Sequence, residues 1–210
     1  MTPSDVIDLM DWLGHDAFRI NASKTIYFDP YQIEGGPTGD IILISHDHFD
    51  HCSPEDVEKI KSPDTMIVTD KKSAKQFKGN VAIVKPGDTI TIAGVEIQVV
   101  NAYNLNKKFH PKKNEGLGFI VTIDGVRIYH AGDTDCIPEM KDIETDIALL
   151  PVSGTYVMTA REACEAALAI NPKVAIPMHY GSVVGDEGDA QAFRDQLKGK
   201  IDVKILPKKA

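Results

Sequence analysis

The sequence predicts an α/β protein in which sheets pack against each other and helices cover the outside. Short β-rich runs occupy both halves of the chain, and each half ends in alternating strands and helices. The 210 residues can bury about 70% of the surface of the unfolded chain, so folding needs no disulfide or structural metal. No linker rich in Pro, Gly or Ser separates the halves. We therefore expect one domain over residues 1–210 with a two-fold internal likeness.

In the first half, strands are predicted where β-branched and aromatic residues form short runs bounded by turn residues. These runs are Ala17–Ile20, Thr25–Phe28, Ile41–Ile44, Thr65–Val68, Val81–Val84, Thr89–Ile92 and Val95–Val100. Two helices are expected between them, Pro54–Lys61 with Ser53 as N-cap and Asp70–Phe77 with Asp70 as N-cap.

The second half begins with a polar loop over residues 101–116, which interrupts the β pattern. The dipeptide Asp124-Gly125 then predicts a tight turn between two strands. From there strands and helices alternate. The predicted elements are the strands Gly118–Ile123, Val126–His130, Asp146–Pro151, Val174–Pro177 and Val203–Leu206 and the helices Thr159–Ile170 and Asp189–Leu197.

Composition excludes several classes of function. The net charge is -8, and such a field repels phosphate backbones, which argues against nucleic acid as a partner. The N-terminus lacks the basic region of a signal peptide, and no run approaches the ~20 apolar residues of a membrane span. The three cysteines have no CxxC spacing. We expect a cytoplasmic protein with buried thiols and no membrane partner.

The chemistry is concentrated where the apolar strand Ile41–Ile44 ends. Three histidines and two aspartates follow within six residues, and imidazole and carboxylate are ligands that zinc prefers. Alternation of the extended chain sends His46 and His48 to one side, while Asp50 and His51 face a second position after the turn. This arrangement suits two ions about 3.5–4 Å apart that share a hydroxide.

The HxHxDH pattern resembles the signature of the metallo-β-lactamase superfamily, and the likeness extends along most of the chain. The segment His130-Ala-Gly-Asp133-Thr resembles the family's Gly-Asp segment, which implies that Asp133 bridges two metals. The segment Pro177-Met-His179-Tyr-Gly resembles the final segment, with His179 as a ligand of the second metal. The resemblance implies a metallo-β-lactamase-like four-layered αβ/βα sandwich. It is nearest to the branch of the ascorbate-6-phosphate lactonase, whose relatives are often oligomeric, and whether this chain forms a homo-oligomer is left open.

One ligand of the family pattern is not obvious in this sequence. Relatives place a third histidine soon after a strand, where this chain has Asn101-Ala102-Tyr103-Asn104. We expect His110 to fill the role, and whether His110 or Asn104 completes the first metal site is left open.

Several further residues are candidates for supporting roles. Asp29 follows a strand and is expected to accept a hydrogen bond from a ligand histidine, which would fix its tautomer. His15 and His130 either line the pocket or satisfy buried hydrogen bonds. Tyr180 either steadies a substrate oxygen or packs beside the ligand that precedes it.

Four lysines surround His110 in a chain that is otherwise acidic: Lys107, Lys108, Lys112 and Lys113. They are interpreted either as a solvated loop or as an electrostatic collar for an anionic substrate.

These residues predict a metal-dependent hydrolase that uses two divalent ions, Zn²⁺ first and Mn²⁺ or iron as alternatives. The substrate is expected to be a small, anionic lactone, ester or phosphodiester, and Asp50 and Asp133 are expected to relay the proton. Two alternatives remain, a diiron redox protein and a non-catalytic metal-binding relic of the fold. The redox branch characteristically carries a glutamate where this chain has His48, which disfavours it.

Overall fold

The computed structural model describes residues 1–209, with short elements throughout. The helices are α1 Pro3–Ile7, α2 Pro54–Ile60, α3 Ala160–Ile170 and α4 Glu187–Leu197, with 3-10 turns η1 Ser73–Gln76, η2 Lys112–Asn114 and η3 Pro138–Asp142. The strands are β1 Met10–Gly14, β2 Ala17–Asn21, β3 Thr25–Phe28, β4 Ile41–Ile44, β5 Met66–Thr69, β6 Asn80–Ile83, β7 Thr89–Ile92, β8 Val95–Ala102, β9 Gly116–Ile123, β10 Val126–His130, β11 Ile147–Pro151, β12 Val174–Met178 and β13 Asp202–Val203.

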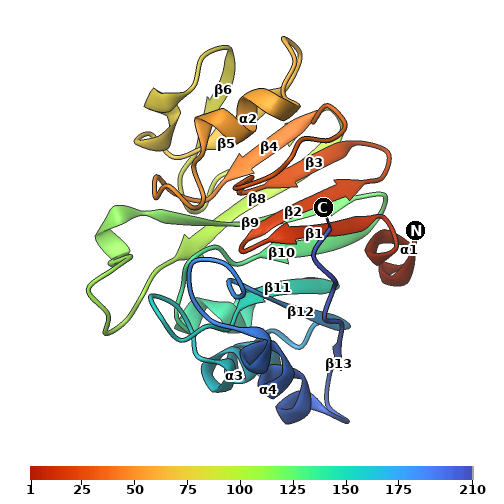
Figure 1. Cartoon of the computed structure of the whole chain (residues 1–210), viewed down its shortest axis with the longest axis vertical. Coiled ribbons are helices and arrows are strands. Elements are labelled where there is room, and N and C mark those ends of the chain that lie inside the picture. Colours follow the sequence, from red (N-terminus) through yellow and green to blue (C-terminus); the bar gives the residue numbers. More distant parts are fainter. Residues whose placement is uncertain (210) are drawn as a thin grey trace.

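The strands form two sheets that pack face to face (Figure 1). The first sheet has the order β1-β2-β3-β4-β5-β6, and the second has the order β13-β12-β11-β10-β9-β8-β7. Helix α2 covers the outer face of the first sheet, and α3 and α4 cover the second. The predicted four-layered αβ/βα arrangement is therefore confirmed.

Strand β4 shows why a continuous apolar run precedes the polar motif. Ile41 and Leu43 belong to the core between the sheets, while Ile42 and Ile44 pack with Val57 of α2 in a second core. A strand that is buried on both faces reads as an unbroken apolar run. Each such side chain contributes about 1.5–3 kcal/mol by leaving water, so the position at which β4 ends is strongly specified.

Parallel pairing brings the ends of distant strands together. Strands β3 to β6 pair in parallel, and so do strands β10 to β13. Parallel strands end at the same edge of a sheet, and open α/β sheets bind ligands outside these carboxyl ends. The segments that follow β3, β4, β10 and β12 consequently meet at one edge of the sandwich.

Two predicted elements differ from the structure. The helix expected over Asp70–Phe77 is wrong, since only the turn Ser73–Gln76 forms. Asp70 does accept the backbone N–H groups of Lys72 and Ser73, but four of the next seven residues are Lys or Gln. A helix this short and polar has no apolar face to stabilise it.

The strand expected over Val203–Leu206 ends at Val203. Beyond Pro207 the tail crosses to the other sheet, where Lys209 donates a backbone hydrogen bond to the carbonyl of Trp12. Helix α1 and strand β1 were not predicted. Helix α1 has a sequence signal, a capping box between Thr2 and Asp5.

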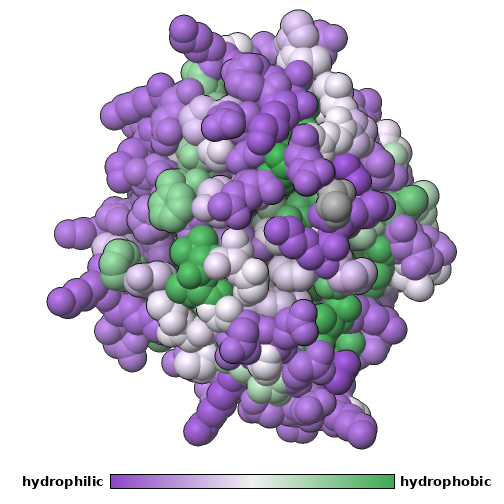
Figure 2. All heavy atoms as spheres, viewed as in Figure 1, coloured by the Kyte–Doolittle hydropathy of each residue, from purple (hydrophilic) through white to green (hydrophobic). Residues whose placement is uncertain are grey.

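The face of the molecule in Figure 2 is mostly hydrophilic, with small and separate apolar patches. Within residues 1–209, no helix has the length and apolar character needed to cross a bilayer.

A substitution at Gly132 tests the close packing behind the polar edge. Gly132 has φ +61, and a Cβ there would lie 2.7 Å from the carbonyl oxygen of Leu117. Gly132→Ala should therefore lower the free energy of unfolding by about 2–4 kcal/mol, from backbone strain plus the clash. Gly125→Ala is the matched control, because its φ is +80 and nothing lies within 4 Å of the added carbon.

For Gly125→Ala we expect only the cost of the left-handed backbone, about 1–2 kcal/mol. Urea unfolding of both variants beside the parent protein measures the difference. Equal losses in the two variants would contradict the packing argument.

Candidate metal centre

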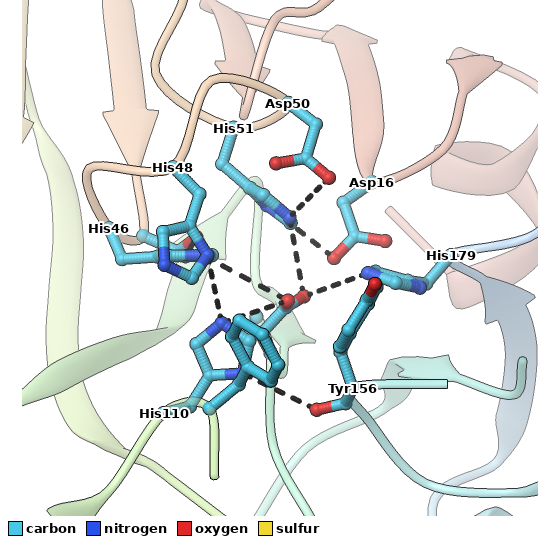
Figure 3. Close-up of polar contacts among 12 residues, drawn as sticks. Asp16, His46, His48, Asp50, His51, His110, Tyr156 and His179 are labelled. Carbon is cyan, nitrogen blue, oxygen red and sulfur yellow. Dashed lines mark hydrogen bonds and ion pairs between the residues drawn. The ribbon is translucent and has the colours of Figure 1, made fainter. Parts of the chain in front are cut away.

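All seven histidines of the chain lie at or next to the edge where the parallel strands end. Asp29 follows β3, His46 to His51 follow β4, Asp133 follows β10, and His179 follows β12. The labelled histidines and Asp50 point toward a common centre (Figure 3). The centre consists of two groups of donor atoms.

The first group consists of His46, His48, His110 and Asp133. His48 Nδ1 lies 3.0 Å from both His46 Nε2 and His110 Nε2. Asp133 Oδ2 lies 3.3 Å from His110 Nε2 and 3.9 Å from His46 Nε2. A tetrahedron of ligands about 2.0–2.1 Å from a metal has edges of roughly 3.3 Å, so four donors with this spacing can surround one ion.

The structure bears on the choice between His110 and Asn104. His110 presents Nε2 to the first group, whereas Asn104 lies behind it and donates hydrogen bonds to the carbonyls of Phe109 and Tyr156. The backbone N–H of Asn104 also donates to the carbonyl of His110 at 2.7 Å. Asn104 thus shapes the loop, and His110 is the side chain that faces the donors.

The second group lies on the other side of Asp133. Asp133 Oδ1 is 3.3 Å from both His51 Nε2 and His179 Nε2, and Asp50 Oδ2 is 3.9 Å from His51 Nε2. His15 Nε2 contacts Asp50 Oδ2 at 3.2 Å and can donate a hydrogen bond to it. The two oxygens of Asp133 therefore face one donor group each, which is the geometry that a bridging carboxylate requires.

Buried polar atoms test whether these residues fit a metal. His51 Nε2 and Asp133 Oδ1 are buried and have no hydrogen-bond partner among the described residues. Buried polar atoms rarely go unpaired in native proteins. Both atoms point into the second group, and their lone pairs are what a divalent cation would bind. The residues therefore fit a metal at this position.

The outer nitrogens of the ligand histidines are held in place. His51 Nδ1 donates to Asp29 Oδ2 at 2.9 Å, and the Ser45 hydroxyl donates to the same oxygen at 2.6 Å. Ser45 in turn accepts from His46 Nδ1 at 2.9 Å. Asp29 thus orients two histidines, one directly and one through Ser45, and directs their Nε2 atoms inward.

Two more anchors come from the loop after β11. The carbonyl of Tyr156 accepts from His110 Nδ1 at 3.3 Å, and Ser153 Oγ contacts His179 Nδ1 at 2.9 Å. Sequence reasoning missed Ser45, Ser153 and Tyr156, because nothing marks such residues before the fold brings them to a histidine. It also missed Asp16, although that residue directly follows His15.

Backbone strain is concentrated at this centre. Five of the ten non-glycine residues with positive φ lie here: His15, Asp29, His110, Tyr156 and His179, with φ between 38° and 69°. Each such residue costs of order 1–3 kcal/mol and persists only where its surroundings impose it. Strain of this kind clusters at functional sites.

The charges on the donors follow from their neighbours. Burial disfavours the charged form of Asp133, yet His179 and His51 hold its pKa well below the usual range. Burial also opposes the charge on His51, but Asp133 and Asp29 raise the pKa of its imidazole well above normal. Burial and the neighbouring His51 lower the pKa of His46 well below normal. The first group therefore has a neutral imidazole ready to bind, whereas His51 must first lose a proton.

Other predicted residues lie outside the donor groups. His130 donates from Nε2 to the carbonyl of Asp16 at 2.9 Å and stacks on Phe28, so it satisfies buried hydrogen bonds. Tyr180 is buried and stacks on Trp12, with ring centroids 4.7 Å apart. Of the two roles expected for this residue, the structure shows the packing role.

The four lysines near His110 do not line the cavity at the first group. Lys107 is paired with Asp135, and Lys112 is paired with Glu139 at 2.8 Å. Lys108 and Lys113 are exposed and form no ion pair with any of residues 1–209. The cation on the cavity wall is instead Lys72, which sequence reasoning did not single out.

Substitutions at the loop after β8 separate the two candidates for the third nitrogen. His110→Ala should reduce the affinity of the first group for Zn²⁺ by a factor of about 100 or more, since one of three imidazoles is removed. Asn104→Ala should retain the same number of ions per chain with a smaller loss of affinity. Zn²⁺ titration followed by calorimetry measures both. Loss of an ion in Asn104→Ala, with full binding in His110→Ala, would reverse the assignment.

Metal binding should release protons. The pKa values of His51 and His179 are raised, so both imidazoles hold protons more strongly than usual before metal binds. Since a ligand imidazole must be neutral, Zn²⁺ should displace about one to two protons near pH 7, and its affinity should rise as pH increases through the raised pKa values. Calorimetry in two buffers of different ionisation enthalpy counts these protons. A binding heat that is independent of the buffer would contradict this prediction.

Comparison with known proteins identifies the family of this chain. The family model of the beta-lactamase superfamily domain matches residues 9–179. A metal-dependent hydrolase of Methanoregula boonei is 32% identical, over 94% of this chain and 93% of its own. A solved structure from Parabacteroides distasonis, described as a metal-dependent hydrolase, is 37% identical with a TM-score of 0.84, covering 93% of this chain and 90% of its own. A metallohydrolase of Ignicoccus hospitalis shares the fold with a TM-score of 0.80 at 22% identity, over 96% and 95% of the two chains.

The matched region contains both donor groups from His15 to His179. The chain therefore belongs to the metallo-β-lactamase superfamily and is a metal-dependent hydrolase.

Proposed function

We propose that the centre binds two divalent metal ions and hydrolyses a small, anionic lactone, ester or phosphodiester. The observation that carries this proposal is the placement of Asp133. Its two oxygens lie 3.3 Å from donors of two separate groups, His110 on one side and His51 and His179 on the other. One carboxylate shared in this way is the usual bridge of a two-metal site.

Two bound ions would supply an activated water and polarise the carbonyl or phosphoryl oxygen of the substrate. The chain provides the rest of the chemistry. His15 Nε2 donates a hydrogen bond to Asp50 Oδ2 at 3.2 Å. Burial raises the pKa of Asp50, but the hydrogen bond from His15 and the nearby histidines lower it, and the net effect is a lowered pKa. Asp50 therefore remains ionised near neutral pH and can accept a proton from the attacking water.

The substrate would enter through a cavity of about 250 Å³ beside the first group. His46, His48 and His110 line this cavity, and so does Lys72. The volume suits a small molecule, and Lys72 provides a positive charge for a phosphate or carboxylate. Lys72 lies 2.5 Å from Asp47, so an anionic substrate would compete with that pair.

Metal content is the direct test. Protein purified without a histidine tag or chelator should contain about two equivalents of Zn²⁺ or Mn²⁺ per chain by mass spectrometry. His51→Ala should lose about one equivalent, and hydrolysis of lactones and phosphodiesters should fall by a factor of about 100 or more. Lys108→Ala, an exposed change nearby, serves as the control and should leave both unchanged.

The other outcomes identify the alternatives. Iron at two equivalents, with oxygen consumption and no hydrolysis, would replace the proposal with redox chemistry. No metal after Zn²⁺ and Mn²⁺ are added back would mean that the centre is a relic.

A further inference from the structure

Asp16 lies beside the second group of donors and has no part in the chemistry described so far. It is fully buried, and neither of its carboxylate oxygens has a hydrogen-bond partner in residues 1–209. Its Oδ2 lies 3.8 Å from His51 Nδ1. Four residues each place one donor atom within 4.8 Å of the others: Asp16, His51, Asp133 and His179. Figure 3 shows the carboxylate of Asp16 between His51 and His179.

An ionised carboxylate in this position is costly unless a cation accompanies it. Taking a carboxylate out of water costs several kcal/mol even in a relaxed protein, and hydrogen bonds normally offset part of that cost. Asp16 has none, whereas the equally buried Asp29 accepts three, from Ser45 twice and from His51. Asp16 thus has no hydrogen bond among the described residues, only the ionic contact with His51.

The charge balance points to the cation. Four buried carboxylates lie in this region, Asp16, Asp29, Asp50 and Asp133. No Lys or Arg among residues 1–209 forms an ion pair with any of the four, whose ionic contacts are all with histidines. These four carboxylates therefore have no cationic Lys or Arg partner among the described residues, and a bound divalent cation would supply the missing positive charge.

The backbone around Asp16 is held on both sides. The carbonyl of Asp16 accepts a hydrogen bond from His130 Nε2 at 2.9 Å. The carbonyl of His15 accepts from Trp12 Nε1 at 2.9 Å and from the backbone N–H of His179 at 3.1 Å. These contacts tie the β1–β2 turn to the strands that carry the donors. The carboxylate is therefore positioned before any ligand arrives, which reduces the entropy lost on binding.

We propose that Asp16 is an additional ligand of the second metal position. The inference rests on the two-metal centre proposed above and deepens it. With Asp16, the second position has three carboxylates and two imidazoles, from Asp50, Asp133, His51 and His179 besides Asp16 itself. The first position has three imidazoles and one carboxylate. Carboxylate oxygen suits Mn²⁺, which takes up to six ligands, so Asp16 makes the second position a site for Mn²⁺ as well as for Zn²⁺.

Asp16→Asn tests this assignment with metal binding as the readout. The variant should bind Mn²⁺ at the second position roughly tenfold or more weakly than the parent protein, measured by calorimetry and by the Mn²⁺ paramagnetic resonance signal. Its affinity for Zn²⁺ should fall by less than about threefold, because a tetrahedral ion still finds four donors without Asp16. Asp56→Asn is the matched control. Asp56 is also buried, but it accepts hydrogen bonds from the backbone of Gln32 and Ile33 and from Lys59, and it belongs to neither donor group.

The outcomes separate this inference from the proposed function. Binding of fewer than two ions by the parent protein would overturn the two-metal centre. Two ions in the parent protein, with unchanged Mn²⁺ affinity in Asp16→Asn, would overturn the role of Asp16 alone. An equal loss of Zn²⁺ and Mn²⁺ would assign Asp16 to positioning His51 instead of binding metal. Circular dichroism checks folding, and Asp16→Ser replaces Asp16→Asn in these titrations if the latter does not fold.

Discussion

The buried carboxylate of Asp133 is the interaction around which the rest of the centre is arranged. Three histidines lie 3.3 Å from its two oxygens, and two of them, His51 and His179, keep it ionised although it is buried. A buried charge of this kind is stable only with close partners of opposite charge. Its position depends on Gly132, whose left-handed backbone turns the chain where a side chain would meet Leu117. The turn after β10 thus places the carboxylate of Asp133 in the centre.

The scaffold places these polar groups by burying apolar ones. Two cores lie on the two faces of the first sheet, and the alternating side chains of β4 fill both. A slip of one residue would exchange the two sets, and neither core would then be filled correctly. The strand therefore ends at one position, and the motif from His46 to His51 begins there. The packing of the β4 side chains into the two cores therefore fixes where the histidine motif begins at the edge of the sandwich.

The centre lowers the stability of the fold through many small contributions. Five residues have positive φ, several carboxylates are buried together, and polar atoms of His51 and Asp133 lack partners among the described residues. These features would destabilise an ordinary core. Hydrogen bonds between the histidines and Ser45, Asp29 and Ser153 hold the imidazoles in place, and bound cations would offset the remaining charge. A centre built in this way gains stability when it binds its ligand.

The sequence by itself determined the fold class, most of the strands and the motif from His46 to His51. Local signals suffice for these, since periodicity, turn residues and ligand spacing all lie within short windows. It also indicated His110, Asp133 and His179 as candidates, in part through resemblance to a family. The short turn at Ser73–Gln76 and the end of β13 were not predictable, because tertiary contacts override local propensity there.

Only the tertiary structure decided which residues support the centre. Asp16, Ser45, Ser153 and Tyr156 carry no distinguishing pattern, and Lys72 lies far in sequence from the lysines near His110. Ser45, Lys72, Ser153 and Tyr156 follow the parallel strands β4, β5 and β11, whereas Asp16 lies in the antiparallel β1–β2 turn. The contacts span 62 residues between His48 and His110 and 114 residues between Asp16 and His130. A sequence shows which side chains could bind a metal, but neighbours this distant are set by the packing of the sheets.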